Sequence, residues 1–98
     1  MIPEATSKVL TASGLVTKGR AKILGMLIGM DGVNDPTITV YDGLDNSGEV
    51  KIPTSTYDAS ALGLNGVEKS YLLRCATGIY VEISGLGSGE VVIYYTEG

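Results

Sequence analysis

Apolar and polar residues alternate along much of the chain with a period of two. Ile38 and Val40 alternate with Thr or Tyr, and Ile79, Val81 and Ile83 alternate with Tyr, Glu and Ser. Successive side chains of a β-strand point to opposite faces, so each run predicts a strand with one buried face. With similar β-rich runs, the expected strands number eight: 8–12, 15–17, 20–30, 37–41, 49–54, 69–76, 79–84 and 90–96.

Turn-forming residues separate these runs. Asp or Asn beside Gly, as in Asp42-Gly43 and Asn65-Gly66, and the glycine-rich stretch 85–89 are typical of tight turns. The spacing predicts an all-β fold of about eight short antiparallel strands in a β-sandwich or jelly-roll-like barrel. Because 98 residues suffice for one core only, we expect an N-terminal arm over 1–9 and a single β-sandwich domain over 10–98.

Two segments permit more than one interpretation. Residues 23–30 are dense enough in apolar residues for a helix, but Gly25 and Gly29 would each cost about 1 kcal/mol in a helix interior. A strand is favoured there, with the glycines on a flat face that lets another backbone approach. Residues 57–66 place Asp58 before a short run rich in Ala and Leu, which predicts a long loop with one helical turn.

The alternation also predicts which side chains are buried. The run 91–95 is apolar on both faces, so Val92 and Tyr94 either contact a partner or remain half-exposed on the surface. The expected core consists of Leu24, Met26, Ile28, Val40, Ile79, Val81, Ile83 and Ile93.

Composition and charge exclude several classes of partner. The net charge of −4 argues against nucleic acid, whose phosphates need a basic face. The run 23–30 is far shorter than the ~20 residues that cross a bilayer, and the start of the chain lacks the basic and apolar regions of a signal peptide, so we expect no membrane segment. The basic residues cluster only at Lys18, Arg20 and Lys22, where they form either a patch for an acidic neighbour or a solvated hairpin end.

No residue pattern indicates catalysis or a cofactor. Histidine, the commonest general base and metal ligand, is absent from the chain. Cys75 lies in an alternating run, where a buried small hydrophobe is the expected role. Glu90 and a following strand disqualify residues 85–89 as a phosphate loop. We therefore expect no catalytic, cofactor-binding or metal site.

Acidic and amide side chains between 31 and 49 raise the alternative of calcium. Their spacing does not fit an EF-hand, and Asp or Asn beside Gly is common in turns. Hairpin tips explain these residues better. The residues are Asp31, Asn34, Asp35, Asp42, Asp45, Asn46 and Glu49.

The order of several motifs resembles a known group of proteins. The motifs are Lys18-Gly19-Arg20, Leu24-Gly25, Ile38 to Asp42, Thr77 to Val81 and Val91 to Tyr95. In this order they resemble small all-β structural proteins of tailed bacteriophages, over about residues 10–95. The chain departs from that pattern in a longer segment at 57–68 and in its extension at 1–9.

The resemblance implies a function without chemistry. We expect a non-enzymatic virion structural protein, made in the host cytoplasm. Capsid decoration or cement proteins, often trimers, are the closest expectation, so the partners would be other copies in a homotrimer and the major capsid protein or another virion protein. The alternative is a tail, neck or fibre component, which could bind host glycans through tyrosines. The candidate interface residues are Ile2, Pro3, Lys8, Lys18, Arg20, Lys22, Val92 and Tyr94.

Overall fold

The chain forms eight antiparallel strands in the computed structural model, which describes residues 6–58 and 66–97. Within those residues the structure contains no helix, and the all-β prediction is confirmed. The strands are β1 (Thr6–Leu10), β2 (Gly14–Lys18), β3 (Ala21–Gly29), β4 (Thr37–Asp42), β5 (Glu49–Thr56), β6 (Gly66–Cys75), β7 (Gly78–Ser84) and β8 (Glu90–Glu97).

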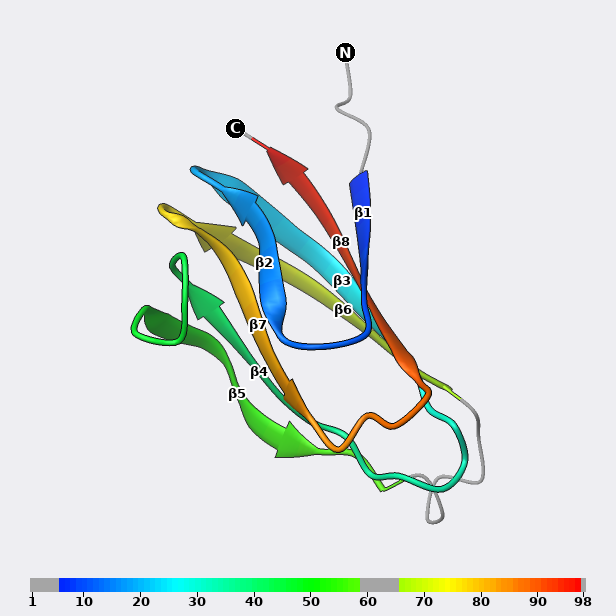
Figure 1. The fold of residues 1–98 in the computed structure, drawn as a ribbon. Coiled ribbons are helices and arrows are strands. Elements are labelled where there is room, and N and C mark those ends of the chain that lie inside the picture. Colours follow the sequence, from blue (N-terminus) through cyan, green and yellow to red (C-terminus); the bar gives the residue numbers. More distant parts are fainter. Residues whose placement is uncertain (1–5, 59–65, 98) are drawn as a thin grey trace.

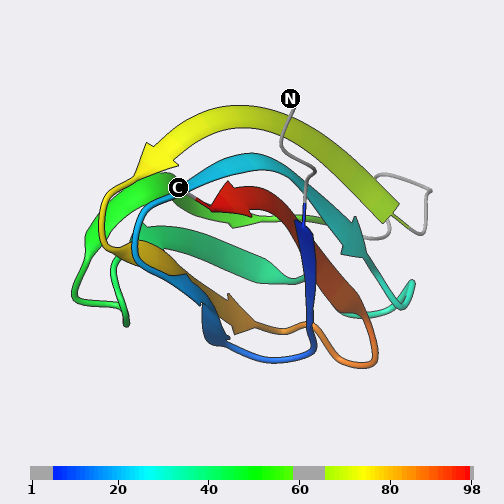
Figure 2. The same ribbon diagram turned by 90° about the horizontal axis from the view of Figure 1, so that it is seen from above.

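The strands lie in two four-stranded sheets that face each other (Figure 1). Sheet A has the order β1-β8-β3-β6, and sheet B has the order β2-β7-β4-β5. The first strand therefore pairs with the last, the second with the seventh, the third with the sixth and the fourth with the fifth. This is the pairing of a long hairpin rolled up on itself, which is the jelly-roll form of the β-sandwich. Figure 2 shows the curved strands wrapped around the interior.

The core lies between the sheets and consists mainly of Ile, Val and Met. Met26 and Ile28 on β3, Ile93 on β8 and Val81 on β7 are inaccessible to solvent. Seven of the eight expected core residues lie in the core or pack against it, Ile83 in the latter position. Burial of these aliphatic side chains supplies most of the favourable free energy of folding, since the chain has no Trp or Phe.

Leu24 was predicted to be a core residue, and that prediction was wrong. The register of β3 shifts between Ile23 and Gly25 against both neighbouring strands: against β8 the extra residue is Leu24, which marks a β-bulge there, and against β6 the extra residue lies on β6. A bulge inserts one extra residue, so the alternation restarts: Ile23 and Met26 both face the core, although an unbroken strand would place them on opposite faces. Leu24 is half-buried and lies outside the core.

The N-terminal part of the chain differs from the expected arm. Residues 6–9 were placed in the arm, although a strand was also expected at 8–12; all four belong to β1, where Val9 lies opposite Val92 and Lys8 opposite Ile93 on β8. Without β1, β8 would be an edge strand with unpaired backbone N–H and C=O groups. Pairing with β1 satisfies the hydrogen bonds of that edge. The helical turn expected within 57–66 falls mainly on residues 59–65, which lie outside the described residues; Tyr57 donates its N–H to the Pro36 carbonyl at 2.9 Å.

Candidate functional site

The outer face of sheet A carries a continuous apolar surface. On β8, Val92 and Tyr94 point away from the core, because Val91, Ile93 and Tyr95 are buried. Cross-strand pairing places Val9 beside Val92 and Val92 beside Leu27, while Tyr94 lies beside Gly25. The sheet A face comprises Val9, Leu24, Leu27, Leu72, Val92 and Tyr94, of which Leu72 is 77% and Val9 52% exposed.

Charged side chains of opposite sign occupy the two ends of the sheet A face. At one end Lys22 on β3 lies directly opposite Arg74 on β6. Toward the other end Glu68 lies opposite Leu27, and Glu90 lies opposite Gly29. None of these four charges forms an ion pair within the described part of the chain, where Lys51–Glu49, at 3.3 Å, is the pair found. The face is therefore apolar in the middle, basic at one end and acidic at the other.

Gly25 keeps the middle of the sheet A face flat. A Cβ atom at this position would lie 3.0 Å from the Lys69 carbonyl oxygen and 3.7 Å from Cδ2 of Tyr94. The Tyr94 ring consequently lies close to the backbone of β3 at Gly25 rather than standing away from it. A side chain at this position would crowd the Lys69 carbonyl and cover the flat surface beside the ring.

The outer face of sheet B presents a second apolar row. Leu15, Tyr80, Tyr41 and Val50 are neighbours across its four strands. The rings of Tyr41 and Tyr80 lie 6.3 Å apart between centroids and are tilted by 48°, a favourable arrangement for an aromatic pair. We call these four residues the sheet B face.

Polar residues continue the outer surface of sheet B beyond the tyrosines. Hydroxyl pairs join β4 to β5, with Thr39 and Thr54 at 2.6 Å and Thr37 and Thr56 at 2.8 Å. Asn46 donates its side-chain amide to Glu82 at 3.0 Å. This side of the molecule thus combines aromatic rings with hydrogen-bonding groups.

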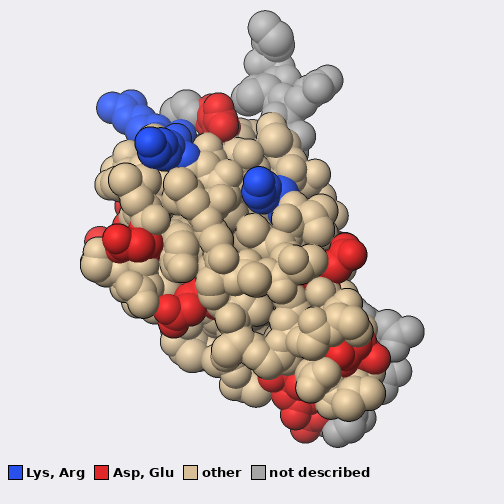
Figure 3. All heavy atoms as spheres, in the orientation of Figure 1, with Lys and Arg blue, Asp and Glu red and all other residues tan. Residues whose placement is uncertain are grey.

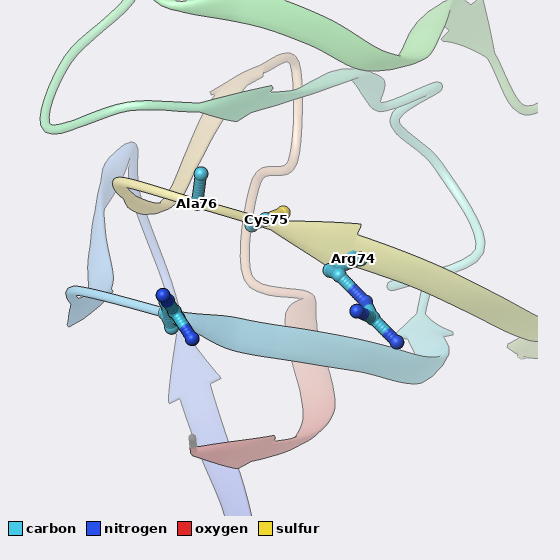
Figure 4. A pocket seen from close by; sticks show the side chains of 4 residues that line it. Arg74, Cys75 and Ala76 are labelled. Carbon is cyan, nitrogen blue, oxygen red and sulfur yellow. The ribbon is translucent and has the colours of Figure 1, made fainter.

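Basic residues gather at the end of the molecule where β2 turns into β3. Figure 3 shows basic side chains at that end and farther down the visible face, with acidic side chains both beside them and over the rest of the visible surface. Between the start of β3 and the end of β6 lies a hollow of about 270 Å³, lined by Arg20, Arg74, Cys75 and Ala76. Figure 4 shows Arg74 extending along this hollow from β6. The two arginines make this hollow electropositive.

The Cys75 thiol is buried and held in its protonated form at neutral pH. Its side chain is fully buried, as expected from the alternation. Burial, together with nearby Asp42, raises the pKa of the Cys75 thiol to about 11. Since the thiolate is the reactive form, this thiol stays protonated and unreactive.

Asp31 connects two loops at the end of the sandwich opposite the basic residues. Its Oδ1 accepts the N–H groups of Val33 (2.9 Å) and Asn34 (2.8 Å), and its Oδ2 accepts the N–H of Ser88 (3.1 Å). Hydrogen bonds from the backbone and side chain of Asn34, then from Val33 and Ser88, hold the pKa of Asp31 well below its usual range. The adjoining Gly87 has φ of 62°, and a Cβ there would clash with the Asp31 carboxylate and the Asn34 amide.

Asp42 plays a similar part at the other end. It accepts the N–H groups of Ala76 (3.0 Å), Thr77 (2.9 Å) and Gly78 (3.3 Å) from the turn between β6 and β7. Partial burial raises the pKa of Asp42, but these hydrogen bonds and nearby Lys51 outweigh it, so the pKa is lowered overall. Asp45 accepts hydrogen bonds from Ser47, which lower its pKa. These acidic residues stabilise loops, and no group of metal-ligating residues occurs among residues 6–58 and 66–97.

The structure brings together only some of the predicted interface residues. Val92 and Tyr94 lie on the sheet A face, and Lys22 lies at its basic end. Lys18 and Arg20 are exposed at the turn between β2 and β3, and Lys8 is exposed on β1; Ile2 and Pro3 lie outside the described residues.

Sequence reasoning missed most of the apolar members of both faces. Val9 lies in the overlap of the expected arm and the strand expected at 8–12 and was given no face, and Leu24 was placed in the core. Leu72 could have been found from the sequence. It lies on the same side of the alternating run as Ser70 and Arg74, so an apolar residue there indicates an apolar outer surface. The pairing of Tyr41 with Tyr80 depends on β4 lying next to β7, which no local pattern predicts.

Comparison with known proteins finds no match among family models, curated proteins or solved structures. The resemblance to phage structural proteins thus depends on the order of motifs alone. Within the described ranges no helix is long and apolar enough to span a membrane.

Proposed function

We propose that the chain is a non-enzymatic structural protein of a bacteriophage particle, a capsid decoration or cement protein that binds the outer capsid lattice as a homo-oligomer. The observation that carries this proposal is the presence of apolar side chains on both outer surfaces of the sandwich, exposed at Val9, Leu72 and Tyr94 on sheet A and at Val50 on sheet B, and half-buried at the other sheet B positions. The sheet A face and the sheet B face point in opposite directions, because each is the outer surface of one of the two layers.

A domain with two apolar faces is suited to joining partners. Exposed contiguous apolar surface commonly marks a protein contact, and this small domain carries it on both layers. If one face binds a further copy, the other remains free for the lattice. An oligomer that contacts several lattice sites at once needs only weak contacts at each of them. Jelly rolls are common in viral capsids, an analogy of fold that agrees with this role.

The parent phage offers a direct test. Particles from a strain in which the gene is deleted should assemble but release their genome at a lower temperature than wild-type particles. Adding the purified chain should restore the original temperature, and a cryo-EM map should show density at a repeated site of the outer capsid. Absence of the chain from purified particles would refute the proposal.

A tail, neck or fibre component that binds host glycans is the second candidate. The Tyr41–Tyr80 pair favours it, because aromatic rings pack against sugar faces and Asn46 and Glu82 carry hydrogen-bonding groups nearby. Binding on a glycan array that is lost in Tyr80→Ala, together with density in the tail rather than the head, would support this candidate over decoration.

A further inference from the structure

We propose that the sheet A face binds the same face of a second copy of the chain. The two copies would be related by a two-fold axis that runs across the strands at the level of Tyr94 and Gly25. The inference specifies the homo-oligomer of the proposed function and rests on that proposal for its biological setting. Charge complementarity and the area of the contact both identify a second copy as the occupant of this face.

When two copies stack through their sheet A faces, the basic end of one copy meets the acidic end of the other only if the partner is turned end over end. Pairing with β3 places Arg74 at the level of Lys22, Ser70 at the level of Gly25 and Glu68 at the level of Leu27. Ser70 thus lies between the basic and the acidic end of β6. A two-fold axis across the strands near this level, at the β6 position midway between Arg74 and Glu68, turns the partner end over end, which brings Arg74 of each copy over Glu68 of the other.

Other orientations of the same two faces are unfavourable. A two-fold axis parallel to the strands would place the Lys22 and Arg74 end against its own copy and bring like charges together. The end-over-end orientation also leaves the middle of the contact apolar, with Leu24 and Leu72 on one side of the axis and Leu27 and Val92 on the other. Charge therefore selects the end-over-end arrangement, and the apolar side chains near the axis are compatible with it.

The spacing between stacked sheets permits these contacts. Two sheets pack about 10 Å apart, a distance that an arginine and a glutamate extending from opposite sheets can bridge. Flat packing is possible because Gly25 and Gly29 interrupt the face, with the Tyr94 ring lying close to the former. The strands of aligned sheets cross at about 30°, which keeps the rows in approximate register over this short face.

The area of the face predicts a weak pair. Four strands about 4.8 Å apart, each about eight residues of 3.3 Å, present roughly 500 Å² per copy. The total of about 1,000 Å² lies at the small end of specific interfaces, so we expect dissociation in the micromolar range. Local concentration on a lattice would favour the pair further.

A two-fold pair departs from the homotrimer that the phage resemblance implies. A patch that contacts its own copy forms an isologous interface, which closes with two copies, whereas a trimer needs two different patches. Pairing through sheet A turns both sheet B faces outward, on opposite sides of the pair. The pair would then be bivalent, with the Tyr41–Tyr80 surface at each end.

The first test uses Leu72→Asp, with Val50→Asp as the matched control. Both residues are exposed apolar side chains of edge strands, at 77% and 49% exposure, but Val50 lies on sheet B. Sedimentation equilibrium should show the full chain passing from its 10.2 kDa monomer to twice that mass as concentration rises. Leu72→Asp, which changes both copies, should raise the dissociation constant about 10- to 100-fold, and Val50→Asp should leave it unchanged.

The second test is a charge exchange on β6. Arg74→Glu and Glu68→Arg alone should each weaken the pair about three- to tenfold, because like charges then meet in both symmetry-related contacts. The double variant restores opposite charges and should regain wild-type affinity. Neither residue has an ion pair within the described structure, so circular dichroism spectra should match the wild type.

Three results would overturn the pairing: a strict monomer at all concentrations, a trimer, or a double variant no tighter than the single ones. The outcome is separable from that of the proposed function. If the wild type joins the particle but is monomeric both in solution and on the particle, as Leu72→Asp is, the pairing fails and decoration stands. If the pair forms but no copy joins purified capsids, decoration fails and the pairing stands.

Discussion

Replacing Asp42 should loosen the connection between the two sheets. Asp42 ends β4, and its carboxylate accepts three N–H groups of the turn that leads from β6 in sheet A to β7 in sheet B. The Asp42→Ala variant removes all three acceptors. Asp42→Asn keeps one oxygen but turns an NH₂ group toward donors, so it should be intermediate.

The magnitude follows from the exposure of the donors. A hydrogen bond to a charged group contributes about 1.5–3 kcal/mol when it is buried. Ala76 and Thr77 are exposed, so water replaces the lost acceptor there, whereas Gly78 is buried. We therefore expect Asp42→Ala to lower the free energy of unfolding by about 2 kcal/mol and Asp42→Asn by about 1 kcal/mol. With a urea slope of about 1.3 kcal/mol/M, the midpoint for Asp42→Ala falls by roughly 1.5 M.

The effect should depend on pH in a defined direction. The pKa of Asp42 is lowered from its ordinary value of 3.8, so the folded state binds this proton more weakly than the unfolded state. Its contribution is present above the ordinary value and is lost as pH falls through the lowered pKa. The difference between wild type and Asp42→Asn should thus be full at pH 7 and shrink in strongly acidic solution.

Urea denaturation followed by circular dichroism measures these differences. Asp45→Asn is the control, because Asp45 bonds only to Ser47 within its own loop, and it should move the midpoint far less. Equal midpoints for wild type and Asp42→Ala at pH 7 would refute the reasoning. A stability difference between wild type and Asp42→Asn that is equally large in strong acid and at neutral pH would also refute it.

Three further outcomes follow from the core, the bulge and the loops. Met26→Ala should lower the free energy of unfolding by about 3 kcal/mol, and Leu24→Ala by under about 1 kcal/mol. Urea midpoints measure this contrast, and equal losses would contradict the bulge in β3. Gly87→Ala should lower the thermal midpoint, because a Cβ there meets the Asp31 carboxylate; an unchanged midpoint would contradict the positive φ. Cys75 should react with a maleimide at neutral pH only after addition of denaturant, and rapid labelling of the folded chain would contradict its burial.

Local patterns determined the strands but not all of their inward faces. The alternation at Ile79 and Val81 and the glycine turns predicted eight strands, because side-chain direction and turn formation depend on neighbouring residues. The same rule failed at Leu24, since a bulge arises from pairing with β8, which lies far away in the chain. The absence of histidine, the commonest general base and metal ligand, could likewise be read from the sequence alone.

Tertiary structure alone decided which strands are neighbours and therefore what the surface presents. Val92 and Tyr94 could be read from sequence as apolar on a second face, but Val9 and Leu72 join them only because β1 and β6 lie in the same sheet. The opposite charges at the ends of β6 gain meaning from their position on that face. Burial, cross-strand contact and charge pattern depend on strand order, and strand order is set by packing of the whole chain rather than by any local segment.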